Sequence, residues 1–314
     1  MARLFIVTPA GAGLRNGNRH TALRWATLLR ASGHRVRVEV AWNGEPCDAL
    51  IALHARRSAD SIARYAGTKK PLIVTLTGTD LYRDLPDSAE ACASLELADR
   101  LIVLQDAALA ELDASRRDKA RVVYQSADPG LAHQPPKAPF RIAVIAHLRS
   151  EKDPLRAVAA LARLPAEAME LVQVGEALDP QLGREAEAWM AREPRYRWLG
   201  GVTHAGALGW MAKSHVLVVS SVMEGGANVI AEAARIGLPV LASRVSGNIG
   251  MLGADYPGYF PLADDAALAA LLARAASDRR FYRSLKGALR ARRKLFAPAA
   301  ERAALVCVVR EVLH

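Results

Sequence analysis

Short apolar runs with strand character alternate with amphipathic helical segments along most of the chain. The opening run RLFIVTP is followed by NRHTALRWATLLRASG, a helical pattern that ends at Gly33. Such alternation is typical of parallel strands joined by crossover helices. Further strand candidates are HRVRVEVA, DALIALHA, KPLIVTLTG, RLIVLQ and ARVVYQS, and later FRIAVIAHL, MELVQVG, YRWLGG, HVLVVSS and LPVLAS. The sequence therefore predicts an α/β fold with two series of parallel strands.

The length of 314 residues favours two domains rather than one core. The Pro-rich stretch HQPPKAPF, near residues 133–140, has no periodicity and is interpreted as the linker. We therefore expect a first domain over residues 1–136 and a second over residues 137–314. Two Rossmann-like domains should face each other across a cleft, with ligands at the carboxyl ends of the strands.

Composition excludes several classes of protein. No apolar run approaches the length of a bilayer span, and the run before Pro9 is too short for a signal peptide. Cys47, Cys92 and Cys307 are odd in number and lack Cys-x-x-Cys spacing, which favours a reducing, cytoplasmic location over disulfides or zinc. Because the chain has no Asp-x-Asp pair, we expect no metal and no cofactor. No signal indicates an oligomeric state.

The formal net charge of +10 requires an anionic partner to be considered. One late stretch is basic and contains no acidic residue, and it is interpreted as a solvated helix face rather than a nucleic-acid or membrane patch. No interleaved aromatic and basic pattern appears, so we expect no nucleic-acid partner. The basic residues of this stretch are Arg283, Lys286, Arg290, Arg292, Arg293 and Lys294.

The segment MEGGANVIAEAARIGLP suits a sugar nucleotide. The turn Gly225-Gly226 allows close backbone approach, and a helix that opens near Asn228 offers amides and a positive dipole end to a diphosphate. Glu232 lies one turn further, about 6 Å along the axis, where a carboxylate could accept from two ribose hydroxyls. Alternatively, Glu224 and Glu232 are only solvated charges. The strand-like runs on both sides favour the binding interpretation.

A second strand end carries two cations, Arg149 and Lys152, in the sequence RSEKDP. Asp153 and Pro154 read as the N-cap and first residue of the next helix. Fixed cations there would stabilise the charge that grows on a diphosphate leaving group, without a metal. Gly175, at the end of MELVQVG, indicates either another close approach to the ligand or a simple turn.

In the first half, a Gly-rich loop follows the opening strand but does not fit G-x-G-x-x-G. Its end could hold a small anion at the cleft, and LTGTD supplies small polar groups at a second strand end. His54 closes a third strand and is either a structural histidine or an acceptor-side group. The candidate acceptor-binding residues are Asn16, Gly17, Asn18, Arg19, His54, Thr77, Gly78, Thr79 and Asp80.

The order of GHRVRV, TGTD, RSEKD, WLGGV and EGGANVIAEAARIGLPVLAS resembles the glycosyltransferase-B fold, in particular the retaining group called family 4. The resemblance covers nearly the whole chain and implies that the last helix, near residues 298–314, returns to the first domain. It implies donor-diphosphate contacts by Arg149 and Lys152, and a sugar contact by Glu224. It further implies phosphate binding by the Asn228 and Val229 amides and ribose binding by Glu232. Gly225, Gly226 and Ala227, just before that helix, are further candidate donor-binding residues.

A narrower resemblance is carried by GNRHTALRWATLLRASGHRV, ALHARRSADSIARYA, LTGTDLYRDL and SGNIGMLGADYPGYFPLAD. These segments are similar to selenosugar synthases of selenoneine biosynthesis, which join selenophosphate to a UDP-sugar, typically UDP-N-acetylglucosamine. The chain departs from the general family at Thr77, where many members have His, and at Gly226, where many have an aromatic residue. The nearby histidines are His20 and His54.

The resemblance implies an enzyme that transfers a sugar from UDP to selenophosphate, with the UDP-sugar as co-substrate. One alternative is an ordinary hexosyltransferase that acts on a sugar or lipid hydroxyl. Another is a basic protein without catalytic activity that binds a nucleotide sugar or a polyanion.

Overall fold

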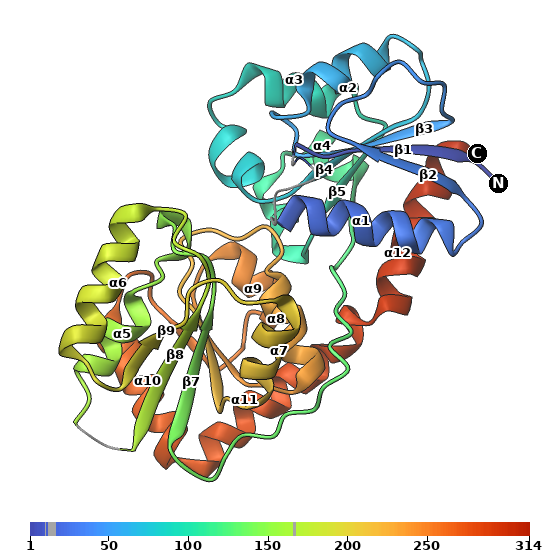
Figure 1. Ribbon diagram of the computed structural model, residues 1–314. Coiled ribbons are helices and arrows are strands. Elements are labelled where there is room, and N and C mark those ends of the chain that lie inside the picture. Colours follow the sequence, from blue (N-terminus) through green and yellow to red (C-terminus); the bar gives the residue numbers. More distant parts are fainter. Residues whose placement is uncertain (10, 12–16, 166–167) are drawn as a thin grey trace. The chain divides into compact units, whose positions relative to one another are not determined.

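The computed structural model describes residues 1–9, 11, 17–165 and 168–314. The chain divides into two compact units, one formed by residues 1–126 and 298–314 and the other by residues 127–297 (Figure 1). Each unit contains a parallel six-stranded sheet with helices packed on it. The predicted α/β fold with two Rossmann-like sheets is therefore confirmed.

In the first unit, the strand order is β2-β1-β3-β4-β5-β6. The strands are β1 (Arg3–Val7), β2 (Arg35–Glu39), β3 (Ala49–Leu53), β4 (Leu72–Leu76), β5 (Arg100–Val103) and β6 (Ala120–Val122). The helical elements are α1 (Gly17–Arg30), α2 (Ala59–Ala66), the π-helix η1 (Asp80–Asp84), α3 (Ala89–Leu97), the 3-10 helix η2 (Asp106–Glu111), α4 (Ala114–Lys119) and α12 (Pro298–Leu313). β1 pairs in register with β2 from Arg3–Arg35 to Val7–Glu39.

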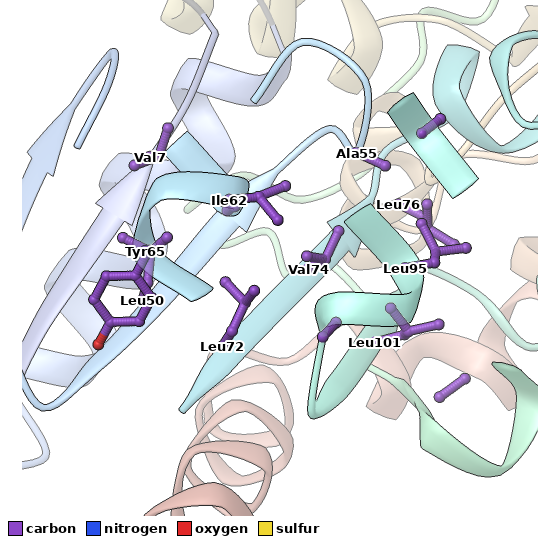
Figure 2. Close-up of a cluster of buried hydrophobic side chains, with 14 of the residues drawn as sticks. Val7, Leu50, Ala55, Ile62, Tyr65, Leu72, Val74, Leu76, Leu95 and Leu101 are labelled. Carbon is purple, nitrogen blue, oxygen red and sulfur yellow. The ribbon is translucent and has the colours of Figure 1, made fainter. Parts of the chain in front are cut away.

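The strands of the first unit are apolar because helices cover both faces of its sheet and bury the side chains on each face. Successive side chains of a strand point to opposite faces. Phe5 and Val7 therefore join one cluster, together with Ile62 and Tyr65 of α2 and Leu95 of α3 (Figure 2). Leu4 and Ile6 join another cluster, with Trp25 of α1 and with Leu305, Val308 and Val309 of α12.

The helix α12 is fastened to this unit by a buried carboxylate as well as by apolar packing. Glu301 is fully buried and accepts hydrogen bonds from Trp25 Nε1 at 2.7 Å and Arg24 Nε at 2.9 Å. The Ser126 amide donates to the same carboxylate at 2.9 Å. The terminal segment is thus an integral part of the first unit.

In the second unit, the order is β12-β11-β10-β7-β8-β9. The strands are β7 (Phe140–Ile145), β8 (Met169–Val174), β9 (Tyr196–Trp198), β10 (Val216–Val219), β11 (Val240–Ser243) and β12 (Tyr259–Phe260). The helical elements are η3 (Ser150–Lys152), α5 (Arg156–Ala162), α6 (Pro180–Arg192), α7 (His204–Ala212), α8 (Asn228–Ile236), α9 (Ser246–Leu252), α10 (Asp265–Ser277), α11 (Arg279–Arg292) and η4 (Arg293–Phe296).

The Pro-rich stretch at residues 133–140 lies within the second unit and is not the crossing between the units. Its backbone is held there, because the His133 amide donates to Ile236 O at 3.2 Å and the Gln134 amide to Ala212 O at 2.8 Å. The chain passes between the units at 126/127 and again at 297/298. Within the described residues, no helix is both long and apolar enough to span a bilayer.

Candidate functional site

Two loops of the second unit follow neighbouring strands at the centre of its sheet. β7 and β10 are paired, and the strand order runs outward from β7 through β8 to β9 and from β10 through β11 to β12. In Rossmann-like sheets, ligands bind at the carboxyl ends of the strands where the order reverses. The loop after β7 carries Arg149 and Lys152, and the loop after β10 carries Glu224. The two predicted charge groups therefore meet at the switch point.

Lys152 and Glu224 form an ion pair in the free protein. Lys152 Nζ lies 2.5 Å from Glu224 Oε1, and Ser221 Oγ donates to the same oxygen at 2.6 Å. The Glu224 side chain is only 8 % exposed, so the ammonium group offsets the cost of burying its charge. Arg149 is exposed at the start of η3. A bound diphosphate would thus compete with Glu224 for Lys152.

The loop after β10 is fixed to the loop after β7 by its backbone and by a serine. Ser220 Oγ donates to Asp153 O at 2.7 Å, and the Val222 amide donates to Glu151 O at 2.9 Å. Ser220 and Ser221 were not predicted as site residues, because single serines form no motif with a recognisable spacing. Their position directly after the strand HVLVV was the available clue.

The predicted N-cap at Asp153 is wrong. Asp153 has a positive φ of 41° and ends η3, while α5 begins at Arg156 after the N-cap Leu155. The Asp153 carbonyl accepts a hydrogen bond from Ser220 Oγ, and the Asp153 carboxylate accepts one from Arg156 Nε at 2.8 Å. Asp153 consequently shapes the turn that carries Lys152 and does not cap the helix.

Gly247 of α9 packs directly on the backbone of Glu224. A Cβ atom at Gly247 would lie 1.9 Å from Glu224 O and 2.7 Å from Glu224 Cβ. Only glycine allows this approach, since real Cβ contacts are much longer. Gly247 is not among the residues predicted from the sequence, and a glycine inside a helix is the signal that could have identified it.

The helix α8 begins at Asn228, as predicted, after the turn Gly225-Gly226 and the N-cap Ala227. The N-cap side chain accepts no hydrogen bond from the helix. Amides at a helix N-terminus can bind an anion, and the predicted phosphate contact by the Asn228 and Val229 amides stays a prediction.

Glu232 contacts a histidine that the sequence analysis did not single out. His204 Nε2 lies 2.8 Å from Glu232 Oε1, with the side chains 66 % and 16 % exposed. The hydrogen bond to Glu232, with the attraction of its charge, raises the pKa of His204. The histidine is the first residue of α7 and 28 residues from Glu232, so no local pattern could have joined them.

Gly175 approaches the loop after β7 rather than open space. Its φ is +151°, and a Cβ atom would lie 2.0 Å from Ala146 O. Its amide donates to Gly200 O at 2.8 Å. The glycine is thus needed for packing between strand ends, and its contact with a donor stays a prediction.

In the first unit, Gly17, Asn18 and Arg19 form the first turn of α1, and Asn16 lies outside the described residues. This turn contains no acidic residue. Thr21 Oγ1 donates to Gly17 O, the first carbonyl of the helix, at 2.9 Å. The amides of this turn could hold a small anion, which stays a prediction.

Asp80 organises the loop after β4. It is fully buried, and its Oδ1 accepts from the amides of Thr77 at 2.8 Å and Gly78 at 2.9 Å. Its Oδ2 accepts from the Ala55 amide at 3.0 Å, which ties this loop to the one after β3. The buried carboxylate of Asp80 thus holds two loops together, and acceptor binding by Asp80 stays a prediction.

His54 fits the structural interpretation. It is 1 % exposed and has a positive φ of 73°. The Arg57 amide donates to Nδ1 at 3.3 Å, so Nε2 carries the hydrogen and donates to Thr79 Oγ1 at 3.1 Å. Burial lowers the pKa of His54, which keeps the ring neutral at pH 7. Thr77 and Thr79 are only partly buried and remain acceptor-side predictions.

The basic stretch lies along α11 and η4. Arg283, Lys286 and Arg290 are exposed on α11, as a solvated helix face would be. Lys286 Nζ lies 3.4 Å from His133 Nδ1. Among the described residues, no group of three or more His, Cys, Asp or Glu side chains could hold a metal ion.

Residues 139–278 match the family model described as glycosyl transferases group 1. This match covers most of the second unit, including both loops and α8.

Several solved structures are similar to nearly the whole chain. HepE of Anabaena, in complex with UDP-glucose, has a TM-score of 0.79 at 16% identity and covers 99% of this chain and 100% of its own. Sucrose-phosphate synthase of Thermosynechococcus elongatus has a TM-score of 0.79 at 18% identity and covers 99% of each chain. The lipopolysaccharide outer core galactosyltransferase WaaB has a TM-score of 0.74 at 13% identity, covering 98% of this chain and 99% of its own. These likenesses show the fold.

Proposed function

We propose that this chain, whose second unit matches the glycosyl transferases group 1 family, is a UDP-sugar glycosyltransferase with selenophosphate as its acceptor. The observation that carries the glycosyltransferase part is the Lys152–Glu224 pair beside the first turn of α8. A cation, a carboxylate and helix amides at one switch point are the groups that a nucleotide diphosphate and its sugar require. HepE, which shares the fold, is described with bound UDP-glucose.

In the proposed donor complex, Lys152 leaves Glu224 for the diphosphate, and the Asn228 and Val229 amides bind a phosphate. Glu224, once released, accepts hydrogen bonds from sugar hydroxyls, and Glu232 accepts from the ribose. Gly225, Gly226 and Ala227 allow the backbone to approach the donor, and Arg149 adds a second cation. Charge that develops on the leaving UDP is then stabilised by Lys152.

The proposed reaction joins selenium to the sugar. The selenium of selenophosphate attacks C1 of N-acetylglucosamine, the C1–O bond to UDP breaks, and UDP leaves with the electron pair. Water then hydrolyses the Se–P bond, which gives phosphate and the 1-selenosugar. The acceptor proposal rests on the resemblance to selenosugar synthases and on the first turn of α1, which contains no acidic residue and whose amides could hold an anion. A cytoplasmic location stays a prediction.

Incubation of the purified protein with UDP-N-acetylglucosamine and selenophosphate tests this proposal. We expect equimolar UDP and a product whose mass spectrum carries the selenium isotope pattern. Transfer to a sugar or lipid hydroxyl with no selenium product would favour the ordinary hexosyltransferase. Normal UDP binding without turnover on any acceptor, with salt-sensitive polyanion binding, would favour the protein without catalytic activity.

Asn18→Ala tests whether the first turn of α1 binds the acceptor and not the donor. We expect the KM for selenophosphate to rise about three- to tenfold, as for loss of one hydrogen bond to an anion. The KM for the UDP-sugar should stay within about twofold, because Asn18 belongs to the first unit and the donor loops to the second. Steady-state kinetics with each substrate varied in turn checks this. A rise in the donor KM alone would reverse the assignment.

A further inference from the structure

The carboxylate of Glu232 is held by one polar partner in the described part of the chain. That partner is His204, whose Nε2 lies 2.8 Å from Oε1. Glu232 sits in the second turn of α8, and its side chain is 16 % exposed, so it remains open to a ligand on one side. A carboxylate has about four acceptor positions on its two oxygens. The histidine therefore leaves most of that capacity for other donors.

His204 is not needed to stabilise α7. The helix is capped by Thr203, whose Oγ1 accepts from the Gly206 amide at 3.1 Å. The buried face of the helix consists of other residues, Ala207, Leu208, Met211 and Ala212. A basic side chain at a helix N-terminus has the unfavourable sign for the helix dipole. The contact with Glu232 is a feature that His204 adds at this position.

The contact links two helices that follow different strands. α7 follows β9, and α8 follows β10, so the histidine joins the first residue of α7 to the second turn of α8. Glu232 has three side-chain torsions, and a hydrogen bond to Oε1 fixes them before a ligand arrives. Such preorganisation lowers the entropy cost of binding. The raised pKa of His204 agrees with a ring that donates to this carboxylate.

We infer that His204 is a positioning residue that holds the Glu232 carboxylate for the ribose hydroxyls of the donor and so makes the chain selective for ribonucleotides over 2′-deoxyribonucleotides. The inference rests on the proposed donor site. It concerns a residue that does not itself touch the sugar, because Glu232 makes the contact. It predicts a difference in binding affinity between UDP and 2′-deoxy-UDP, which differ by one hydroxyl.

Calorimetric titration with UDP and with 2′-deoxy-UDP tests the inference. The intact protein should bind UDP more tightly than 2′-deoxy-UDP. His204→Ala should weaken UDP binding about three- to tenfold and weaken 2′-deoxy-UDP binding by a smaller factor, because Glu232 can contact both ribose hydroxyls of UDP but only the 3′-hydroxyl of 2′-deoxy-UDP. At saturating donor, kcat should also stay within about twofold. His204→Gln keeps a donor and should restore most of the UDP affinity.

Two further variants serve as controls. Thr203→Ala removes the cap of α7 but keeps His204, so it should lower stability and leave the preference for UDP intact. In the Glu232→Ala background, His204→Ala should have no added effect on UDP binding. Equal losses for both nucleotides, additive effects of the two substitutions, or a Thr203→Ala phenotype like that of His204→Ala would overturn the inference.

The outcomes also separate this inference from the proposed function. If Glu232→Ala weakens UDP binding but His204→Ala does not change the preference for UDP, only the role of His204 is rejected. If the intact protein binds neither nucleotide, or Glu232→Ala leaves UDP binding unchanged, the donor site and the role of His204 are both rejected.

Discussion

Lys152→Ala is expected to lower kcat by about 10²–10³-fold and to weaken UDP binding by no more than about tenfold. Removal of one preorganised group that stabilises developing charge typically costs this much in rate. The ground-state effect should be smaller because Lys152 is already paired with Glu224 at 2.5 Å, and UDP binding must break that pair. Single-turnover kinetics and calorimetry measure the two effects separately.

Arg156→Ala is the matched control for this prediction. It removes a cation close to Lys152 in the chain, but Arg156 pairs with Asp153 at 2.8 Å and with Asp265 at 3.6 Å. We expect kcat within about threefold of the intact protein and a stability loss of at most about 1 kcal/mol, as for other partly exposed ion pairs. Equal losses of kcat and of UDP affinity in Lys152→Ala would mean that Lys152 contributes to ground-state binding alone.

Gly247→Ala is expected to lower kcat about 10²-fold and to reduce the free energy of unfolding of the second unit by about 1–3 kcal/mol. The new methyl group would lie 1.9 Å from Glu224 O, so the Glu224 loop or α9 must move by more than 1 Å. A shift of that size in a positioned group costs about 10²-fold in rate, and overpacking costs a few kcal/mol. Activity assays and denaturant unfolding measure both.

Gly287→Ala is the control for this substitution. Gly287 lies in the interior of α11, and nothing is found within 4 Å of its added Cβ. Alanine there should stabilise the helix by about 0.5–1 kcal/mol and leave kcat unchanged. If Gly247→Ala kept full activity, close packing of α9 on Glu224 would not be required for catalysis.

The sequence predicted the strands well, because strands covered on both faces are recognisable as apolar runs. It also predicted the start of α8 at Asn228, since the Gly-rich turn before an amphipathic run is a strong local signal. It placed the boundary between the units about ten residues too late, because Pro content marks irregular backbone and does not show which carbonyls hold that backbone.

The contacts within the site were less predictable than its elements. Lys152 and Glu224 are 72 residues apart, and their pairing follows from the strand order, in which β7 lies beside β10. Asp80 was taken for an acceptor-side group, although an Asp shortly after Thr-Gly is also a typical turn residue that accepts from nearby amides. His204 and Gly247 act through distant partners, so only the folded chain reveals them.

A crystal structure of the protein with UDP tests the donor site most directly. The account predicts the diphosphate at the first turn of α8, with Lys152 Nζ moved from Glu224 to a phosphate oxygen and the ribose hydroxyls on Glu232. UDP bound elsewhere, or bound with the Lys152–Glu224 pair intact and Glu232 without a ribose contact, would contradict the account.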